Sequence, residues 1–247
     1  MATSGQEGAI AVTGASRGIG AAIALELARR GHTVGCLTRK GKGVEQGKAK
    51  GEFINVACDV TDEASVTQAL AAVAKEGGGL CGLVNNAGIH IESASNTLST
   101  ATYEDVMRVN ATAVFVASRE AHPHLVAAGG GLIVNIGSYF DKVGVKGTLA
   151  YCASKAAVGA ITRCLAVEWA RDNIAVVDVA PGYVETDLNR EYLRSERGRT
   201  SLERRVPVKR AGETQEVARL VAALFQEDIK FLTGETIYVD GAQGINA

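Results

Sequence analysis

Short apolar runs typical of strands alternate with helical patterns along almost the whole of this 247-residue chain. The residues 19–30 show the helical pattern clearly, because Ile19, Ile23 and Leu27 recur about one turn apart and Gly31 then ends the repeat. Such alternation is typical of βαβ units with right-handed crossovers, which build parallel sheets. We therefore predict an α/β fold with a doubly wound parallel sheet of about seven strands and helices on both faces.

The predicted elements follow from the apolar runs and the residues that interrupt them. The strands are expected at residues 9–14, 32–38, 52–60, 80–88, 131–138, 173–182 and 235–241. The helices are expected at 19–30, 62–75, 102–128 with an interruption at Pro123, 150–171 and 213–226. The charged stretch 187–210 is only weakly periodic, and we expect short helices there that form a lid over a cleft.

The composition fits a single domain spanning residues 1–247, with 47% hydrophobic and 21% charged residues. The 26 basic and 27 acidic residues nearly balance, which does not favour binding to nucleic acid or to a membrane surface. We see no secretory leader and no apolar run long enough to cross a bilayer. The five cysteines form no CxxC pair, so we expect no disulfide framework and a cytoplasmic location. The four histidines lack metal-ligand spacing, and we expect no metal site.

A glycine-rich turn follows the first predicted strand and reads TGASRGIG, residues 13–20. Gly14, Gly18 and Gly20 allow a tight turn and remove the Cβ atoms where a pyrophosphate would approach the backbone. The next helix would point its N–H groups and its dipole at that anion. Although the turn alone is weak evidence, its place between a strand and a helix predicts a dinucleotide site.

The end of the second predicted strand favours NADP(H) over NAD(H). An NAD site usually has an acid about 20 residues after the glycines, but here the segment reads Thr38, Arg39 and Lys40. Arg39 would pair with a 2′-phosphate, and Arg17 in the glycine turn can approach the same group. The alternative is that Arg39 and Lys40 merely begin a solvated basic loop.

Tyr151 and Lys155 lie four residues apart in the segment YCASK, so on a helix they share one face. We predict that the ammonium group lowers the pKa of the phenol by about 2–3 units and so adapts it to acid–base catalysis. The alternative is a surface pair with no catalytic role.

The motifs TGASRGIG, NNAG (85–88), YCASK (151–155) and PGYVET (181–186), in this order, resemble the short-chain dehydrogenase/reductase family over nearly the whole chain. The resemblance implies a single domain of the Rossmann type, a nicotinamide cofactor and a homotetramer. It also implies a catalytic set in which Ser138 binds the substrate oxygen, Tyr151 exchanges the proton, Lys155 holds the nicotinamide ribose and Asn110 fixes a water.

The resemblance also implies which residues bind the cofactor. Asp59 would bond the adenine, Asn86 would support the pocket, and Thr186 would lie against the nicotinamide carboxamide. The full implied set is Gly14, Ser16, Arg17, Gly18, Ile19, Gly20, Arg39, Asp59, Val60, Asn86, Ala87, Gly88, Tyr151, Lys155, Pro181, Gly182, Val184 and Thr186.

The predicted function is NADP(H)-dependent interconversion of a ketone and a secondary alcohol. The substrate pocket is expected from residues 90–95, residues 139–145 and the segment after Pro181, which supply aromatic and apolar side chains. The first alternative is a 3-oxoacyl-carrier-protein reductase, which the sequence resembles overall. Residues 126–131 lack the charge expected for docking an acidic carrier, although the arginines of 190–210 could replace it. Further alternatives are a non-catalytic NADP(H) sensor and a sugar-nucleotide epimerase or dehydratase.

Overall fold

The computed structural model describes residues 8–44, 49–186, 189–227 and 229–246. Seven parallel strands form one sheet in the order β3-β2-β1-β4-β5-β6-β9. Their bounds are β1 Ala9–Thr13, β2 Val34–Thr38, β3 Phe53–Ala57, β4 Leu80–Asn85, β5 Gly131–Ile136, β6 Ile174–Pro181 and β9 Thr236–Val239. The prediction of a single doubly wound domain of the Rossmann type is confirmed.

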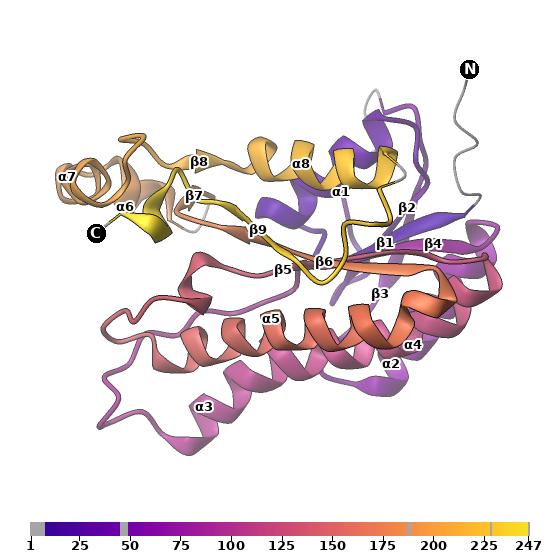
Figure 1. Cartoon of the computed structure of the whole chain (residues 1–247), viewed down its shortest axis with the longest axis horizontal. Helices are drawn as coiled ribbons and strands as arrows, with labels where there is room; N and C mark the ends of the chain where they lie inside the picture. The colour runs from indigo at the N-terminus through magenta and orange to yellow at the C-terminus, as the bar shows by residue number, and fades with distance from the viewer. Residues whose placement is uncertain (1–7, 45–48, 187–188, 228, 247) are drawn as a thin grey trace.

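Helices cover both faces of this sheet, as Figure 1 shows. On one face lie α1 (Gly18–Arg29) and α8 (Thr214–Gln226), and on the other lie α2 (Glu63–Glu76), α4 (Ala113–Ala127) and α5 (Leu149–Trp169). Side chains along β1 point alternately to the two faces of the sheet and pack in both helix layers. Ile10 and Val12 belong to one buried cluster, and Ala9 and Ala11 belong to the other. The sheet is therefore largely apolar on both faces, as is typical of parallel sheets.

The strand order reverses between β1 and β4, and this reversal positions the site. β1 pairs with β2 on one side and with β4 on the other. Connections leaving neighbouring strands on opposite faces open a crevice at the carboxyl ends, where such folds bind ligands. All the predicted strands except the second were too long at this edge, most of all the third and fourth, because β3 ends at Ala57 and β4 at Asn85. The residues beyond them leave the sheet and line the crevice.

The predicted helix 102–128 is interrupted, but Pro123 is not the cause. It consists of α3 (Thr100–Met107), a π-helical turn at Arg108–Thr112, and α4, which continues through Pro123. The buried Asn110 lies in that turn, where its side chain accepts from Ile89 N at 2.8 Å and donates to Ile89 O at 2.9 Å. A side chain that binds backbone from another segment accounts for the widened turn.

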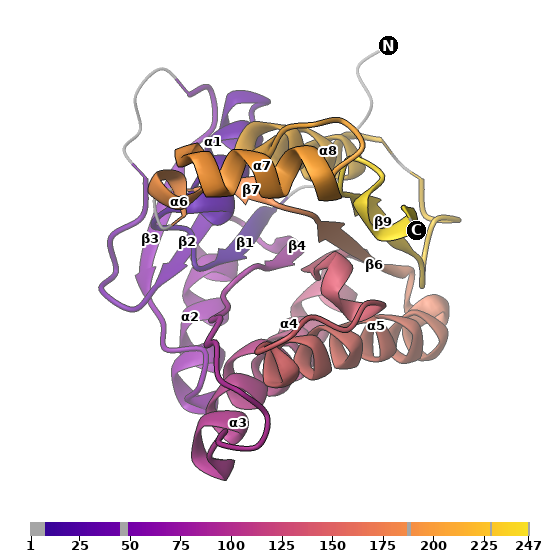
Figure 2. The same cartoon turned by 90° about the vertical axis from the view of Figure 1, so that its left-hand side faces the viewer.

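The predicted lid segment forms α6 (Arg190–Arg194) and α7 (Glu196–Arg205), which lie over the carboxyl ends of the strands in Figure 2. Residues 187–188 of that segment lie outside the described residues. Leu193, Leu202 and Val206 form a small core under the two helices. Two short strands that the sequence did not indicate, β7 (Val184–Glu185) and β8 (Gly212–Glu213), pair in parallel at the base of the segment. No helix in the described part of the chain has the length and hydrophobicity needed to cross a bilayer.

Candidate active site

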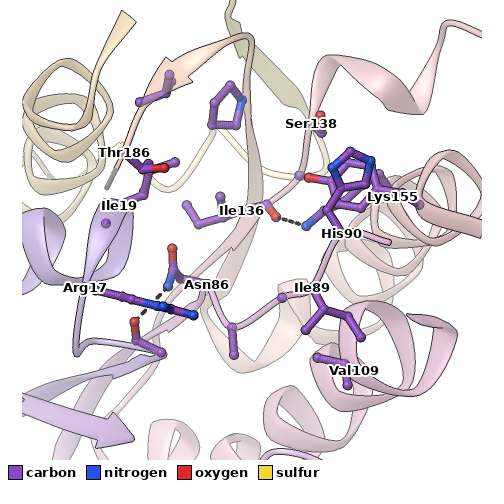
Figure 3. Close-up of a pocket in the computed structure, with 18 of the residues that line it drawn as sticks. Arg17, Ile19, Asn86, Ile89, His90, Val109, Ile136, Ser138, Lys155 and Thr186 are labelled. Carbon is purple, nitrogen blue, oxygen red and sulfur yellow. Dashed lines mark hydrogen bonds between the residues drawn. The ribbon is translucent and has the colours of Figure 1, made fainter. Parts of the chain in front are cut away.

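A cavity of about 690 Å³ opens at the carboxyl ends of the strands, and Figure 3 shows the side chains that converge on it. It is lined by the glycine turn, the ends of β2 and β4, the segment after β5, the start of α5 and the segment after β6. Every residue of the implied cofactor set lines it except Gly20. This cavity therefore brings together residues that are widely separated in the sequence.

The glycine turn has the geometry that its residues predict. Gly14 and Gly18 adopt φ values of 68° and 58°, in the left-handed region that glycine tolerates best. Gly18 begins α1, so the first N–H groups of this helix lie where the turn meets the cavity. This arrangement fits a pyrophosphate, since it combines open backbone with the positive end of a helix dipole.

Gly20 supports the turn from behind. A Cβ atom there would lie 2.3 Å from Asn86 Nδ2 and 2.5 Å from Gly14 O. The Asn86 amide donates to Thr13 O at 2.9 Å and to Gly14 O at 3.3 Å. Gly20 is therefore needed for packing, while Asn86 ties the segment after β4 to the glycine turn.

Two guanidinium groups line the cavity where the glycine turn meets the carboxyl end of β2. They belong to Arg17, in the turn, and to Arg39, directly after the strand. Asp59 also lines this end, but its Oδ1 accepts from Thr61 N at 2.9 Å and from Thr61 Oγ1 at 2.7 Å. These bonds, assisted by the charges of Arg39 and Arg108, lower the pKa of the Asp59 carboxyl. Asp59 thus stabilises its own turn, and the arginines leave this end suited to an anion.

The predicted catalytic residues meet at the other end of the cavity. Ser138, Tyr151 and Lys155 all line it, and Lys155 Nζ lies 5.6 Å from the centre of the Tyr151 ring. Lys155 is buried and donates to Ile136 O at 2.7 Å, the bond drawn in Figure 3. The structure thus brings the Tyr151 phenol, the Ser138 hydroxyl and the Lys155 ammonium group together. The spacing of YCASK predicts this for Tyr151 and Lys155 but not for Ser138.

The predicted lowering of the Tyr151 pKa is wrong for this structure. The pKa of Tyr151 lies above its ordinary value because burial disfavours the phenolate, and a hydrogen bond from Ser138 only partly opposes this. The charge of Lys155 does not prevent this rise, since its ammonium group donates to the Ile136 carbonyl rather than to the phenol. Burial also lowers the pKa of Lys155 to about 8, against the opposing charge of Asp178. Desolvation therefore outweighs the attraction between the two groups.

Asn110 lies behind the cavity rather than in its lining. Its amide donates to Ser154 Oγ at 3.1 Å, and Ser154 Oγ donates to Tyr151 O at 2.7 Å. With Ile89 as its other partner, Asn110 connects the π-helical turn to the second turn of α5. Its predicted role in holding a water stays a prediction.

The expected substrate segments are partly confirmed as lining. His90, Glu92, Tyr139, Phe140 and Tyr183 line the cavity. The His90 and Tyr151 ring centres are 4.6 Å apart. From the lid segment, Asn189, Tyr192 and Leu193 also line it, and the sequence patterns did not single them out.

Sequence reasoning also missed Asp178, although its signal was present. It is the one charged residue in the apolar strand β6, and it is fully buried beside the site. Elsewhere in the described residues, no group of three or more His, Cys, Asp or Glu side chains is arranged to hold a metal ion.

Comparisons with known proteins agree with this arrangement. Residues 14–243 match a family model described as Enoyl-(Acyl carrier protein) reductase. The chain is similar to 3-oxoacyl-[acyl-carrier-protein] reductase MabA of Mycobacterium tuberculosis, with 35% identity covering 96% of this chain and 92% of the relative. It is also similar to a glucose 1-dehydrogenase of Gluconobacter oxydans, with 37% identity covering 94% of this chain and 90% of that protein.

Solved structures give the same result for the fold. A short-chain type dehydrogenase/reductase from Mycobacterium marinum superposes with a TM-score of 0.88 at 30% identity, covering 96% of this chain and 95% of that chain. Because the sequence match and the shape both extend over nearly the whole chain, this protein belongs to the short-chain dehydrogenase/reductase family of oxidoreductases.

Proposed function

We propose that this protein is an NADP(H)-dependent oxidoreductase that interconverts a ketone and a secondary alcohol. The observation that carries the proposal is the convergence of Ser138, Tyr151 and Lys155 on the cavity that also receives the glycine turn. When bound, the nicotinamide supplies or accepts the hydride at the carbon of the reacting C–O group. The protein then has to bind the oxygen and move one proton.

The raised pKa of Tyr151 keeps its phenol protonated, which is the form that carbonyl reduction requires. A phenol that stays protonated can donate its proton to the substrate oxygen as the new C–H bond forms. The Ser138 hydroxyl would bind the same oxygen, and the Lys155 charge would stabilise the phenolate left behind. Lys155 would also bind the nicotinamide ribose, so its charge matters both for holding the cofactor and for the proton transfer.

NADP(H) is the proposed cofactor because Arg17 and Arg39 line the end of the cavity opposite the catalytic residues. A 2′-phosphate there would find two guanidinium groups and one carboxylate that is already bonded to Thr61. The site proposed for NADP(H) is the implied cofactor set, with Gly20 acting behind the lining and the others within it.

The direct test is a rate comparison with purified protein, using NADPH and NADH against acetoacetyl thioesters, aryl ketones and diketones. Reduction of at least one carbonyl class with NADPH, much faster than with NADH, is the expected result. If no carbonyl is reduced although NADPH binds, the sensor alternative replaces the proposal.

A second candidate is reduction of a 3-oxoacyl group held on an acidic carrier protein. Relatives with this activity in their names support it, as does a groove beside the cavity. The groove lies between the lid segment and the start of α8, shares Leu193 with the cavity, and is lined by Arg190, Arg194, Arg199, Lys209 and Arg210 with Glu185, Glu203 and Glu213. Arg190 and Arg194 pair with Glu185 and Arg210 pairs with Glu216, but cations still outnumber carboxylates in the groove, which suits an acidic partner.

Reversing one charge in that groove tests the carrier candidate. We expect Arg199→Glu to lower the rate with an acetoacetyl carrier protein by about tenfold relative to the rate with a small ketone, because a rim charge acts mainly on association. The effect should shrink as salt is added. An unchanged ratio of the two rates would favour a free small-molecule ketone. Lys75→Glu, a charge reversal at an exposed position of α2 and outside the lining of this groove, is the control.

We also propose a homotetramer in the cytoplasm, as the family resemblance implies. Exposed apolar side chains support assembly: Val167 on α5 is 81% exposed and Phe115 on α4 is 41% exposed. Val167→Asp is expected to shift the protein to a smaller species, because a charge in a buried contact is costly. Light scattering of the variant beside wild-type protein measures this, and an unchanged mass would place Val167 outside any interface.

A further inference from the structure

Asp178 is a fully buried carboxylate on β6, the strand next to the edge strand β9, at 0% exposure. It pairs with Asn135 of β5 and with Thr236 of β9. Its Oδ2 accepts from Thr236 Oγ1 at 3.2 Å, whereas its Oδ1 is buried without a well-formed hydrogen bond, although the nearby backbone N–H of Gly137 also favours the ionised carboxyl. A charge in such a place is unfavourable unless something compensates it.

The position of Oδ1 identifies the compensating group. A Cβ atom on Gly137 would lie 2.4 Å from Asp178 Oδ1, so the carboxylate occupies the space beside this glycine. The preceding residue, Ile136, accepts the Lys155 Nζ bond at 2.7 Å through its carbonyl. Asp178 and Lys155 therefore both lie against the peptide that joins residues 136 and 137. Among the described residues no direct ion pair joins them, so they interact across that peptide.

The charges around this peptide come from several elements. Lys155 and Tyr151 come from α5, Asp141 from the 3₁₀ turn Tyr139–Asp141, and Tyr238 from β9. Lys142 Nζ lies 3.3 Å from the centre of the Tyr238 ring, but the cation whose field lowers the pKa of Asp178 is Lys155, while the charge of Asp141 raises it. Burial dominates and raises the pKa of Asp178 to about 6. Between about 6 and about 8 both Asp178 and Lys155 are therefore charged.

We propose that Asp178 is a positioning residue of the active site, whose buried carboxylate keeps the Lys155 ammonium group charged and directed at the Ile136 carbonyl. This inference rests on the proposed function, since Lys155 is where the cofactor ribose and the reacting phenol meet. Asp178 does not line the cavity and acts through Lys155. The motifs of the family do not include it, and its distance of 23 positions from Lys155 hides the relation in the sequence.

Asp178→Asn tests this inference, because it keeps the shape and removes the charge. In wild-type protein, kcat/KM for carbonyl reduction at saturating NADPH should fall below about pH 6 as Asp178 takes up a proton, and above about pH 8 as Lys155 loses one. In the variant the acid limb should disappear. The alkaline limb should move down by about 1 pH unit, since an opposite charge that held Lys155 protonated is gone. A profile of unchanged shape, even at lower rate, would overturn the inference.

Two further variants keep the test decisive. Asp141→Asn removes another carboxylate of the same region, which accepts from Tyr238 OH at 2.7 Å, and it should leave the alkaline limb in place. Thr236→Val removes the hydrogen bond that stabilises ionised Asp178, so the acid limb should move to higher pH. If Asp178→Asn does not fold, the Thr236→Val profile decides: an unmoved acid limb overturns the inference.

A measurement without turnover separates this inference from the proposed function. The rate at which acetic anhydride acetylates Lys155, followed by mass spectrometry over a range of pH, reports its pKa directly. That pKa should be lower in Asp178→Asn than in wild-type protein. A shift in a protein that reduces no carbonyl would reject the proposed function and keep the link between Asp178 and Lys155. An active enzyme without the shift would reject the link alone.

Discussion

Replacing Tyr151 by phenylalanine is expected to lower kcat for carbonyl reduction by a factor of about 10²–10⁴, the usual contribution of a positioned proton donor. Only the transferable proton is removed. The ring remains to pack against His90 at 4.6 Å and against Phe140 at 5.7 Å between ring centres. NADPH binding, followed by its fluorescence, should therefore stay close to wild type while turnover is lost.

Tyr183→Phe is the matched control for Tyr151→Phe. Tyr183 also lines the cavity, but it packs on Tyr139 at 5.8 Å rather than next to Lys155. Its loss of a hydroxyl should reduce turnover far less than the loss at Tyr151. Near-normal turnover of Tyr151→Phe, or equal losses in both variants, would remove Tyr151 from the mechanism.

Arg39→Glu is expected to weaken NADPH binding by about 100-fold, because a charge-assisted contact to phosphate is worth about 1.5–3 kcal/mol and each 1.4 kcal/mol is tenfold. The new carboxylate would accept the ribose hydroxyls of NADH instead, so the ratio of NADH to NADPH affinity should rise further. Parallel titrations of both cofactors measure the two affinities.

Lys40→Glu is the control for this cofactor prediction. Lys40 follows Arg39 in the chain and is exposed, but it is not among the lining residues of the cavity. Its charge reversal should change NADPH affinity only weakly, and less so at higher salt. A wild-type preference for NADH, or equal effects of the two variants, would show that Arg39 only begins a solvated loop.

Patterns in the chain predicted most of the fold because they are local. The glycine turn was identified from Gly14, Gly18 and Gly20, since tight turns and close backbone approach depend on residue type. The shared helix face of Tyr151 and Lys155 follows from their spacing alone. The interruption in the long helix was placed wrongly at Pro123, because Asn110 widens its turn by bonding to Ile89, which is distant in the sequence.

Electrostatics at the site could not be predicted in the same way. Spacing suggested that Lys155 lowers the pKa of Tyr151, yet burial raises it. How deeply a side chain is buried depends on every element packed around it. The pKa shift caused by burial can be as large as the opposite shift caused by a nearby charge, so the net direction does not follow from spacing. The relation of Asp178 to Lys155 was hidden for the same reason.

The sequence by itself therefore determined the order of strands and helices, the family, and which residue types meet a nucleotide and a carbonyl, because periodicity and turn chemistry are encoded in neighbouring residues. Only the tertiary structure decided that Asp178 and Lys155 lie against the same backbone peptide, that the Asp178 carboxylate is buried, and in which direction each pKa is shifted. Those properties arise from contacts between β5, β6 and α5, which are far apart in the chain and adjacent in space.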